Sequence, residues 1–465
     1  MSKTTPDKKL SLRMFLALGL VVGTLASIWP LSSARAQGLP LIRDTEIELL
    51  LNDYSQSIFK AAGLGTGRVT VRIVNNEAFN AFVIDGRNVF MHTGTLMQSN
   101  TPNEVIGVIA HEAGHIAGGH MAALRARIAK DQTRALLVQL LGIGAMIGGA
   151  ASGSNEIGSA GQGVMMGGNE LIMRGLTAER RSQESAADQA GLRYLNDSQQ
   201  SGLGMLATFE RFAGQELFSD AHQTAFARTH PVATDRLARL RQLVETSPYY
   251  SKKDPPALQL RHDMMRAKLS GYMEAPTIVF NRYPMSDNSL PARYARTIAS
   301  FRQGESGFGQ ALAGADALIA EYSNNPYFWE IKGDFLQKSG RAKESIAPLR
   351  KALALHKGDA PLVGVQLAQA LLQTKEPKFS EEAINLLRKA VQREPDNATA
   401  YNTLGQAYYD KGLMAQSELA RAQGLFYFGA VKQAQEFAKR AQGRLTPGSP
   451  DWVKADDIIN YKPQT

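Results

Sequence analysis

The residues best suited to chemistry in this chain are the five at 111–115, which read His-Glu-Ala-Gly-His. A capping box at 101–104, with proline at the first helical position, predicts that they lie on a helix. His111 and His115 are about one turn apart, so both imidazoles project from one face of that helix. Such a pair binds one metal ion, usually zinc, and Glu112 beside it can accept a proton from water. The motif therefore predicts one Zn²⁺ per chain and hydrolytic chemistry.

A catalytic zinc ion needs a third protein ligand, and the sequence offers two candidates. His120 nearly completes the pattern H-E-x-x-H-x-x-G-x-x-H, but it falls one position early. The residue at the position that the pattern requires is Met121. Glu184 and Asp188 lie four residues apart in a second expected helix, at 178–195, whose small residues allow close packing. Glu184 fits as the third ligand, and Asp188 fits as an acceptor that orients a metal-binding imidazole. We interpret His120 as a structural or supporting histidine, and a solvated acidic face is the competing interpretation of the carboxylate pair.

These motifs together resemble a known family. H-E-x-x-H followed by E-x-x-x-D marks the gluzincin metallopeptidases of the HtpX and CAAX-prenyl-protease type. The segments 75–82, 88–94 and 229–231 resemble the family's strand leading to the active site, its hairpin return and its late H-P motif, and Arg236 follows at the usual distance. The resemblance covers roughly residues 39–243. It fits best the soluble periplasmic branch with a tetratricopeptide tail, because the transmembrane segments of the integral branches have no counterpart in this sequence.

The resemblance carries expectations for further site residues. It implies that His230 lies near the metal on a segment that can cover the site, and that Arg236 supports the ligands. His230 would either coordinate the open metal position or stabilise the oxyanion, and a plain helix-entry histidine is the alternative. An edge strand containing Asn80, Ala81 and Phe82 would bind the backbone of an extended substrate through main-chain hydrogen bonds.

The first 36 residues predict secretion. Lys8, Lys9 and Arg13 precede an apolar stretch at 14–28, which is short for a membrane span, and residues 34–36 form an Ala-x-Ala cleavage site. An uncleaved membrane anchor is the alternative. The chain contains no cysteine, which excludes lipoprotein anchoring and disulfide bonds. Export and the family resemblance together predict the periplasm of a Gram-negative cell, reached after cleavage of the signal peptide.

Length and composition are those of an ordinary globular protein. The 465 residues predict two or three domains, and 44% of them are hydrophobic. The net charge is +9, of which +4 lies in residues 1–36. Because the sequence has no dense Lys/Arg patch with interleaved aromatic residues, a nucleic-acid partner is not indicated.

Local patterns predict a small sheet just before the metal-binding helix. Residues 68–74 alternate as a strand, and the runs 79–84 and 87–92 flank Asp85-Gly86, which is typical of a hairpin turn. The apolar, then glycine-rich segment at 136–169 is harder to interpret. We expect a buried helix to about residue 150 and a mobile loop over 152–169. Contact with a membrane surface or an outer-membrane partner through 136–169 is the functional alternative.

A repeat follows a proline-rich connector. Gly333, Ala368 and Gly405 occupy equivalent positions at spacings of 35 and 37 residues, and Trp329 and Tyr401 each stand four residues before their glycine. This period is typical of tetratricopeptide helix pairs, whose concave surfaces bind segments of partner proteins.

The fold class predicted is therefore mainly α with a small β-sheet: a zincin metallopeptidase domain followed by a tetratricopeptide α-solenoid. The expected organisation is signal peptide 1–36, peptidase domain 37–245, helical connector 246–305, repeat domain 306–445 and C-terminal tail 446–465.

The function expected is that of a zinc metalloendopeptidase of the bacterial envelope. The resemblance implies misfolded or stalled envelope proteins, including outer-membrane proteins, as substrates, and the outer-membrane assembly machinery as a partner. A chaperone or assembly scaffold with a largely latent protease is one alternative. A zinc hydrolase acting on non-peptide cell-wall bonds is another, against which a polypeptide-binding tail argues.

Overall fold

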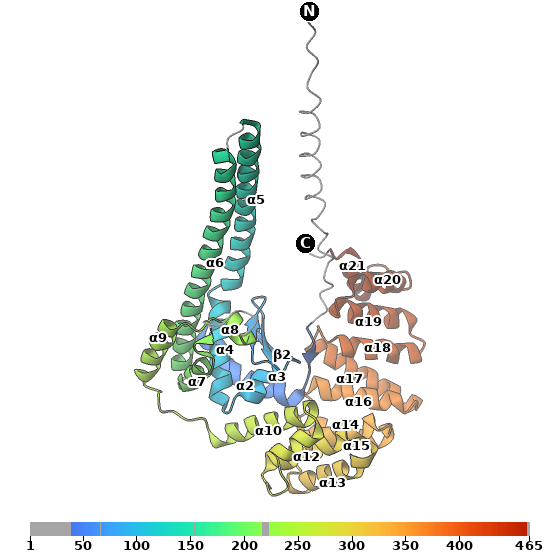
Figure 1. Cartoon of the computed structure of the whole chain (residues 1–465). Helices are drawn as coiled ribbons and strands as arrows, with labels where there is room; N and C mark the ends of the chain where they lie inside the picture. Colours follow the sequence, from blue (N-terminus) through green and yellow to red (C-terminus); the bar gives the residue numbers. More distant parts are fainter. Residues whose placement is uncertain (1–38, 66, 153–154, 216–222, 463–465) are drawn as a thin grey trace, which may run out of the picture. The chain divides into compact units, whose positions relative to one another are not determined.

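The computed structural model describes residues 39–65, 67–152, 155–215 and 223–462, with the side chains of 142–165 and 168–169 excepted (Figure 1). Leu41–Thr465 form one compact unit. The predicted signal peptide lies outside the described residues. Within the described part of the chain, no helix combines the length and the apolar character needed to cross a membrane.

A four-stranded sheet forms in the first part of the chain, in the order β1-β2-β4-β3. The predicted hairpin is confirmed, because β3 and β4 pair antiparallel with Phe82 opposite Phe90. β2 runs parallel to β4 on its other side. β3 is therefore an edge strand, as expected for the strand that contains Ala81 and Phe82. The strands are β1 Leu41–Ile42, β2 Thr70–Val74, β3 Ala81–Val83 and β4 Asn88–His92.

The helix of the H-E-x-x-H motif is α4, Pro102–Ala117, and nearly all of it is buried. Its start follows the predicted capping box, since the Thr101 hydroxyl accepts a hydrogen bond from the Glu104 backbone N–H at 3.3 Å. The Glu104 carboxylate in turn accepts from the backbone N–H of Asn100. This helix packs on α2, Thr45–Ala61, and is preceded by the short α3, Thr93–Gln98.

Two long helices follow, α5 at His120–Ser152 and α6 at Asn155–Asp197, which lie side by side in Figure 1. The helix expected at 136–150 is confirmed, but its expected burial is wrong for residues 136–141, because Leu136, Leu137, Leu140 and Leu141 are exposed. The mobile loop expected at 152–169 is wrong from residue 155 onward, because that stretch is helical. Glycine in a helix costs about 1 kcal/mol relative to alanine, which is why the local sequence suggested a loop. Contacts between the two antiparallel helices, for example the ion pair of Arg127 with Glu179, stabilise α6. The local sequence pattern does not contain these contacts.

Glycine allows α4 and α6 to approach closely. A Cβ atom on Gly114 would lie 2.7 Å from the carbonyl oxygen of Ala187, and one on Gly191 would lie 3.0 Å from the backbone of Ala110. The small residues noted in the sequence around Glu184 therefore bring the second motif against the first. Three shorter helices follow α6 in the chain: α7 Leu203–Phe212, α8 Ala225–Thr229 and α9 Thr234–Glu245.

The connector begins with α10, which packs into the core of the peptidase region. Met265 and Leu269 of α10 belong to the same buried cluster as the apolar residues of α4. His262 contacts the Tyr54 hydroxyl through Nδ1 at 3.0 Å and the Ser99 carbonyl oxygen through Nε2 at 2.9 Å. The helices of the expected connector are α10 Pro256–Met273, α11 Pro276–Arg282 and α12 Leu290–Arg302, and α13 Glu305–Glu321 begins the expected repeat domain.

Helix pairs follow in the part of the chain where the repeat is predicted. Gly333 lies where a Cβ would come within 2.5 Å of Leu349, and Gly405 where it would come within 2.8 Å of Arg421, so both glycines mark close helix crossings. A single 3₁₀ turn, η3 at Pro377–Phe379, accounts for the longer second spacing. The helices are α14 Pro326–Lys338, α15 Ala342–Leu355, α16 Pro361–Gln373, α17 Ser380–Arg393, α18 Ala398–Asp410, α19 Met414–Tyr427, α20 Val431–Gln442 and, in the expected tail, α21 Pro450–Asn460.

Gly114→Ala tests the close approach of α4 and α6. Its methyl group would clash with the Ala187 backbone, so we expect the free energy of unfolding to fall by about 1–3 kcal/mol, with a parallel loss of bound metal. Gly364→Ala in α16 is the matched control, because nothing lies within 4 Å of its Cβ position and alanine favours a helix by about 1 kcal/mol. Chemical denaturation measures both. Equal stability of Gly114→Ala and the parent protein would contradict the packing.

Candidate metal centre

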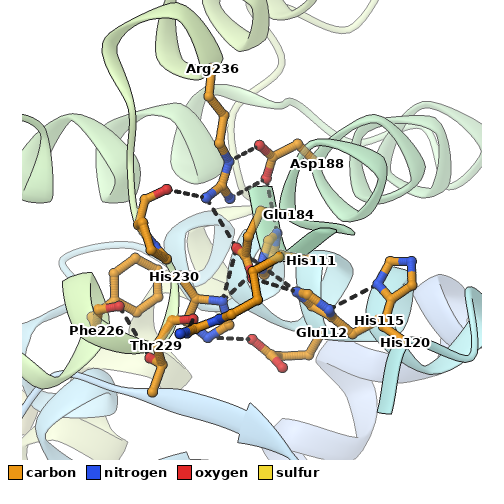
Figure 2. A network of polar contacts seen from close by, with 12 residues as sticks. His111, Glu112, His115, His120, Glu184, Asp188, Phe226, Thr229, His230 and Arg236 are labelled. Carbon is orange, nitrogen blue, oxygen red and sulfur yellow. Dashed lines mark hydrogen bonds and ion pairs between the residues drawn. The ribbon is translucent and has the colours of Figure 1, made fainter. Parts of the chain in front are cut away.

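Four side chains from three segments converge on one point (Figure 2). They are His111 and His115 of α4, Glu184 of α6, and His230, which follows α8, and their ligand atoms all lie within 4.8 Å of one another. Nε2 of His111 is 3.1 Å from Nε2 of His115, and the Glu184 carboxylate lies 3.4 Å and 3.3 Å from these two nitrogens. The structure thus brings the two predicted histidines and the predicted carboxylate together.

The donor set fits a zinc ion. Ligands about 2.1 Å from a tetrahedral zinc are about 3.4 Å from one another, close to the separations found among His111, His115 and Glu184. Two imidazoles and one carboxylate are also a donor set found in catalytic zinc sites. The cluster is buried, so these groups have little access to bulk water.

A hydrogen bond at the far side of each histidine on α4 fixes which nitrogen faces the metal. With its proton on Nδ1, His111 donates to Asp188 Oδ1 at 3.0 Å and leaves Nε2 as the ligand atom. His115 Nδ1 lies 3.0 Å from Nδ1 of His120, so a proton on the His115 atom would be accepted there. His120 itself lies outside the four-residue cluster, and its geometry is that of a supporting histidine.

Arg236 of α9 holds the two carboxylates of α6 in place. It contacts Asp188 through Nε and, at 2.7 Å, through Nη2, and its Nη1 lies 3.0 Å from Glu184 Oε2. The same Nη1 donates to the Pro231 carbonyl oxygen at 2.8 Å. Its guanidinium also lies over the Phe209 ring, 4.9 Å from the centroid. One buried cation therefore ties the ligand helix to the segment that carries His230.

Electrostatics keep both carboxylates ionised. Burial opposes ionisation of Glu184, but His230, His111 and His115 hold the pKa of that carboxyl well below its usual value. Burial likewise opposes ionisation of Asp188, whose pKa is lowered by Arg236 and His111. For His115, burial lowers the imidazole pKa, which favours the neutral form that a metal requires. Burial opposes protonation of His111, but its hydrogen bonds with Asp188 and Glu184 raise its pKa to about 9, so metal binding there would release a proton. The two ionised carboxylates supply the negative charge that a cation needs.

Glu112 is fully buried beside this cluster, yet neither of its carboxylate oxygens has a hydrogen-bond partner among the described residues. His230 Nε2 lies 3.5 Å from Oε1 of Glu112. Burial of a carboxylate without a hydrogen-bond partner destabilises the fold, so the presence of Glu112 here indicates a functional role and not a structural one. This position is the one expected for the residue that accepts a proton from water.

His230 occupies a crowded position between the metal cluster and the edge strand. Its Nδ1 lies 3.2 Å from both His111 Nε2 and Glu184 Oε2, and its Nε2–H donates to the Ala81 carbonyl oxygen at 3.1 Å. The neighbouring Thr229 hydroxyl donates to the side-chain oxygen of Asn80 at 2.9 Å. The imidazole therefore contacts Ala81, one of the residues expected to bind substrate, as well as the ligands, while Thr229 contacts Asn80.

Sequence reasoning missed one residue of this network. Arg180 of α6 donates from Nη2 to the carbonyl oxygens of Arg228 and Thr229, at 3.1 Å and 3.2 Å. Together with Arg236 it clamps the backbone on both sides of His230. Arg180 lies four residues before Glu184 on α6, so its proximity to the site could have been inferred, but nothing in the sequence indicates backbone carbonyls as its partners. Phe82, by contrast, stacks on Phe90 across the strand pair and meets the His92 ring edge-on.

Comparison with known proteins agrees with this geometry. Residues 46–244 match peptidase family M48, and residues 380–412 match a TPR repeat. The chain carries an M48 metallopeptidase domain.

Similar proteins extend the match beyond the M48 domain. The beta-barrel assembly-enhancing protease of Escherichia coli (strain K12) is 23% identical over 431 residues, which cover 90% of this chain and 84% of that protein. The protein of the same name from Yersinia pestis is 23% identical over 439 residues, with the same coverage. Metalloprotease LoiP of Escherichia coli (strain K12) is 28% identical over 173 residues, 37% of this chain and 62% of that protein. The family resemblance and the tetratricopeptide tail predicted from the sequence are thus confirmed, and the chain is a metallopeptidase.

Replacement of the third ligand tests the centre. Glu184→Ala removes a donor and should sharply lower zinc content, whereas His120→Ala removes only the acceptor of a ligand's hydrogen bond. Loss of such a supporting group costs roughly 10–100-fold in metal affinity, so His120→Ala should retain zinc at micromolar supply. Metal analysis after dialysis against a graded chelator series ranks the two variants. The reverse ranking would assign the third ligand to His120.

Proposed function

We propose that this chain is a zinc-dependent endopeptidase of the bacterial periplasm that cleaves misfolded or stalled envelope proteins. The observation that carries the proposal is the buried cluster of His111, His115 and Glu184 with the partnerless carboxylate of Glu112 beside it. Such an arrangement has the parts required to hydrolyse a peptide bond.

The chemistry divides between the metal and the protein. A zinc ion held by His111, His115 and Glu184 would polarise the scissile carbonyl and lower the pKa of a water molecule. Glu112 takes the proton of the attacking water on a carboxylate oxygen and passes it to the leaving amine. Asp188 keeps the proton of His111 on Nδ1 throughout, and Arg236 keeps Asp188 ionised.

The substrate backbone would extend β3. The His92 N–H donates to the Asn80 carbonyl oxygen, and Phe82 pairs with Phe90, so residues 80 and 82 bond inward to β4. Ala81 therefore presents its carbonyl oxygen to the open edge. An extended peptide bonded there gains affinity through main-chain contacts, which suits an enzyme that must accept many unfolded sequences.

His230 restrains the enzyme in this proposal. Its Nδ1 faces the metal position, and its Nε2–H uses the Ala81 carbonyl oxygen that an incoming peptide needs. Substrate binding and the resting position of His230 are therefore mutually exclusive. Arg180 and Arg236 hold this resting position through the backbone of residues 228, 229 and 231. Release of the segment would open the metal and the strand edge together.

The repeats would select the substrates and partners. A cavity of about 590 Å³ lies away from the metal centre, between the start of α2, α10 and the repeat helices, and it is lined by amide side chains such as Gln366, Gln369 and Gln373. Amides bond to any peptide backbone, which suits binding of unfolded segments. The names of the similar proteins refer to beta-barrel assembly. We extend this role to the present chain, with outer-membrane proteins as substrates and their assembly machinery as a partner.

A chaperone or assembly scaffold with a largely latent protease is the second candidate function. The burial of His230 against the metal ligands favours it, because that conformation admits no substrate. The two functions predict different results for a variant that lacks Glu112. A scaffold would still support envelope assembly, whereas a protease that must degrade stalled proteins would not.

The Glu112→Gln variant tests the base. Glutamine keeps the size of the side chain but cannot accept a proton, so cleavage of an unfolded protein should fall by roughly 10²–10⁴-fold. Zinc content should stay unchanged, because the three ligands remain. Casein digestion alongside metal analysis makes the comparison. Undiminished cleavage would refute the assigned mechanism, and joint loss of zinc and activity would make Glu112 structural.

His230→Ala and Arg180→Ala test the restraint. Both should raise basal proteolysis, including self-cleavage, several-fold with zinc retained, because each releases the segment over the site. Arg181→Ala is the matched control, being an exposed arginine on the same helix. Turnover of one unfolded substrate decides the matter. If His230 stabilises the oxyanion instead, His230→Ala slows turnover by roughly 10²-fold or more.

A further inference from the structure

The paired helices α5 and α6 expose an unusual number of large apolar side chains. They have more than half of their surface exposed: Leu136, Leu137, Leu140, Leu141, Met166, Leu171 and Met173. Single exposed apolar side chains are normal on soluble proteins, but a gathering of them marks an interaction surface. All seven side chains lie outside the metal centre and take no part in its contacts.

The register of the two helices places these residues in adjoining turns. Arg127 of α5 pairs with Glu179 of α6 at 3.2 Å, and it lies against Gly175. Because the helices are antiparallel, residues further along α5 face earlier residues of α6. Leu136–Leu141 therefore stand near the level of Met166, beyond the Arg127–Glu179 pair. We call these seven side chains the apolar band.

Basic residues adjoin and partly overlap the apolar band, and they extend from it toward the peptidase core. Residues 125–134 and 170–181 contain seven arginines and lysines against three acidic residues, a net charge of +4. The basic side chains are Arg125, Arg127, Lys130, Arg134, Arg174, Arg180 and Arg181. Except for Arg127, which is half-buried, they are exposed.

An apolar band with basic residues on one side matches the layers of a phospholipid surface. Apolar side chains enter the acyl boundary, and arginine and lysine lie at the level of anionic headgroups. Helices that lie on or dip into an interface need no complete membrane span. A protein partner would bury the apolar side chains equally well, but it would not require the adjoining positive charge.

We propose that the apolar band and the flanking basic residues bind the surface of an anionic phospholipid bilayer. This contact does not depend on the peptidase activity. It would hold the M48 domain at a membrane face, where unfolded membrane proteins are concentrated. The sequence suggested a membrane contact at 136–169. The proposal places this contact on the apolar band and the adjoining basic residues, and it names anionic phospholipid as the lipid that they bind.

Vesicle flotation tests the proposal with protein that lacks residues 1–36, whose apolar stretch would bind lipid by itself. Leu41–Thr465 form one compact unit, so this protein keeps its fold. The vesicles are phosphatidylethanolamine with one quarter phosphatidylglycerol, compared with pure phosphatidylcholine. We expect binding to the anionic vesicles that weakens between 50 and 300 mM NaCl, because exposed charges are screened by salt.

Two double variants separate the apolar and charged contributions. Leu137→Glu with Leu141→Glu, and Lys130→Glu with Arg174→Glu, should each weaken binding to the anionic vesicles by roughly tenfold or more. Met285→Glu with Phe428→Glu is the matched control, because both side chains are highly exposed but lie outside α5 and α6. Circular dichroism checks that helix content is kept, and casein hydrolysis should be the same in all proteins.

Three outcomes would overturn the proposal. Flotation of the leucine variant as strongly as the parent would remove the apolar band from the contact. Equal binding to both vesicle types at either salt concentration would remove the role of anionic lipid. Absence of flotation, with self-association in sedimentation that the leucine variant abolishes, would make the band an interface between copies of this chain. Loss of casein hydrolysis in every protein, the parent included, would count against the proposed function and not against the lipid contact.

Discussion

The guanidinium of Arg236 is the group on which the rest of the metal centre depends. Glu184 and Asp188 are buried one turn apart on the same helix face, where two negative charges would repel each other and lose hydration. Arg236 contacts both, and the protein thus keeps the two carboxylates ionised without a metal. Removal of one partner from such a buried set costs about 3–5 kcal/mol, because an uncompensated charge is left behind. The contacts of Arg236 with Glu184 and Asp188 therefore fix the position of α9, the helix that carries this arginine.

A second constraint is the distance between α4 and α6. The ligands on these helices meet only because Gly114 and Gly191 carry no side chains at the crossing. The helices themselves are held by the apolar core around α4, to which the sheet contributes Val89 and Met91. The edge strand β3 and the metal centre consequently share one rigid support. His230 bridges them, since it contacts both the ligands and Ala81.

Sequence alone predicted the parts of the site that depend on local geometry. The i, i+4 spacing placed His111 with His115, and the same spacing with small neighbours indicated Glu184 and Asp188. The roles of His230 and Arg236 came from family resemblance, because no local pattern joins residue 230 to residue 111. The helix at 155–169 and the clamp by Arg180 were not predicted. Both rest on contacts between distant segments, namely antiparallel helix pairing and an arginine bonded to backbone oxygens, which leave no periodic trace in the sequence.

The seam between the connector and the M48 domain has a consequence for how the molecule unfolds. Lys268 of α10 is buried against Asp44, which itself caps α2, and Asp254 accepts the Asn103 N–H in the first turn of the metal-binding helix. Melting of α10 would thus leave the carboxylates of Asp44 and Glu46, at the start of α2, without the ammonium group that neutralises them. The start of α2 therefore depends on the connector helix for its charge balance. Movement at the start of the connector would therefore be felt at the first turn of the helix that carries His111 and His115.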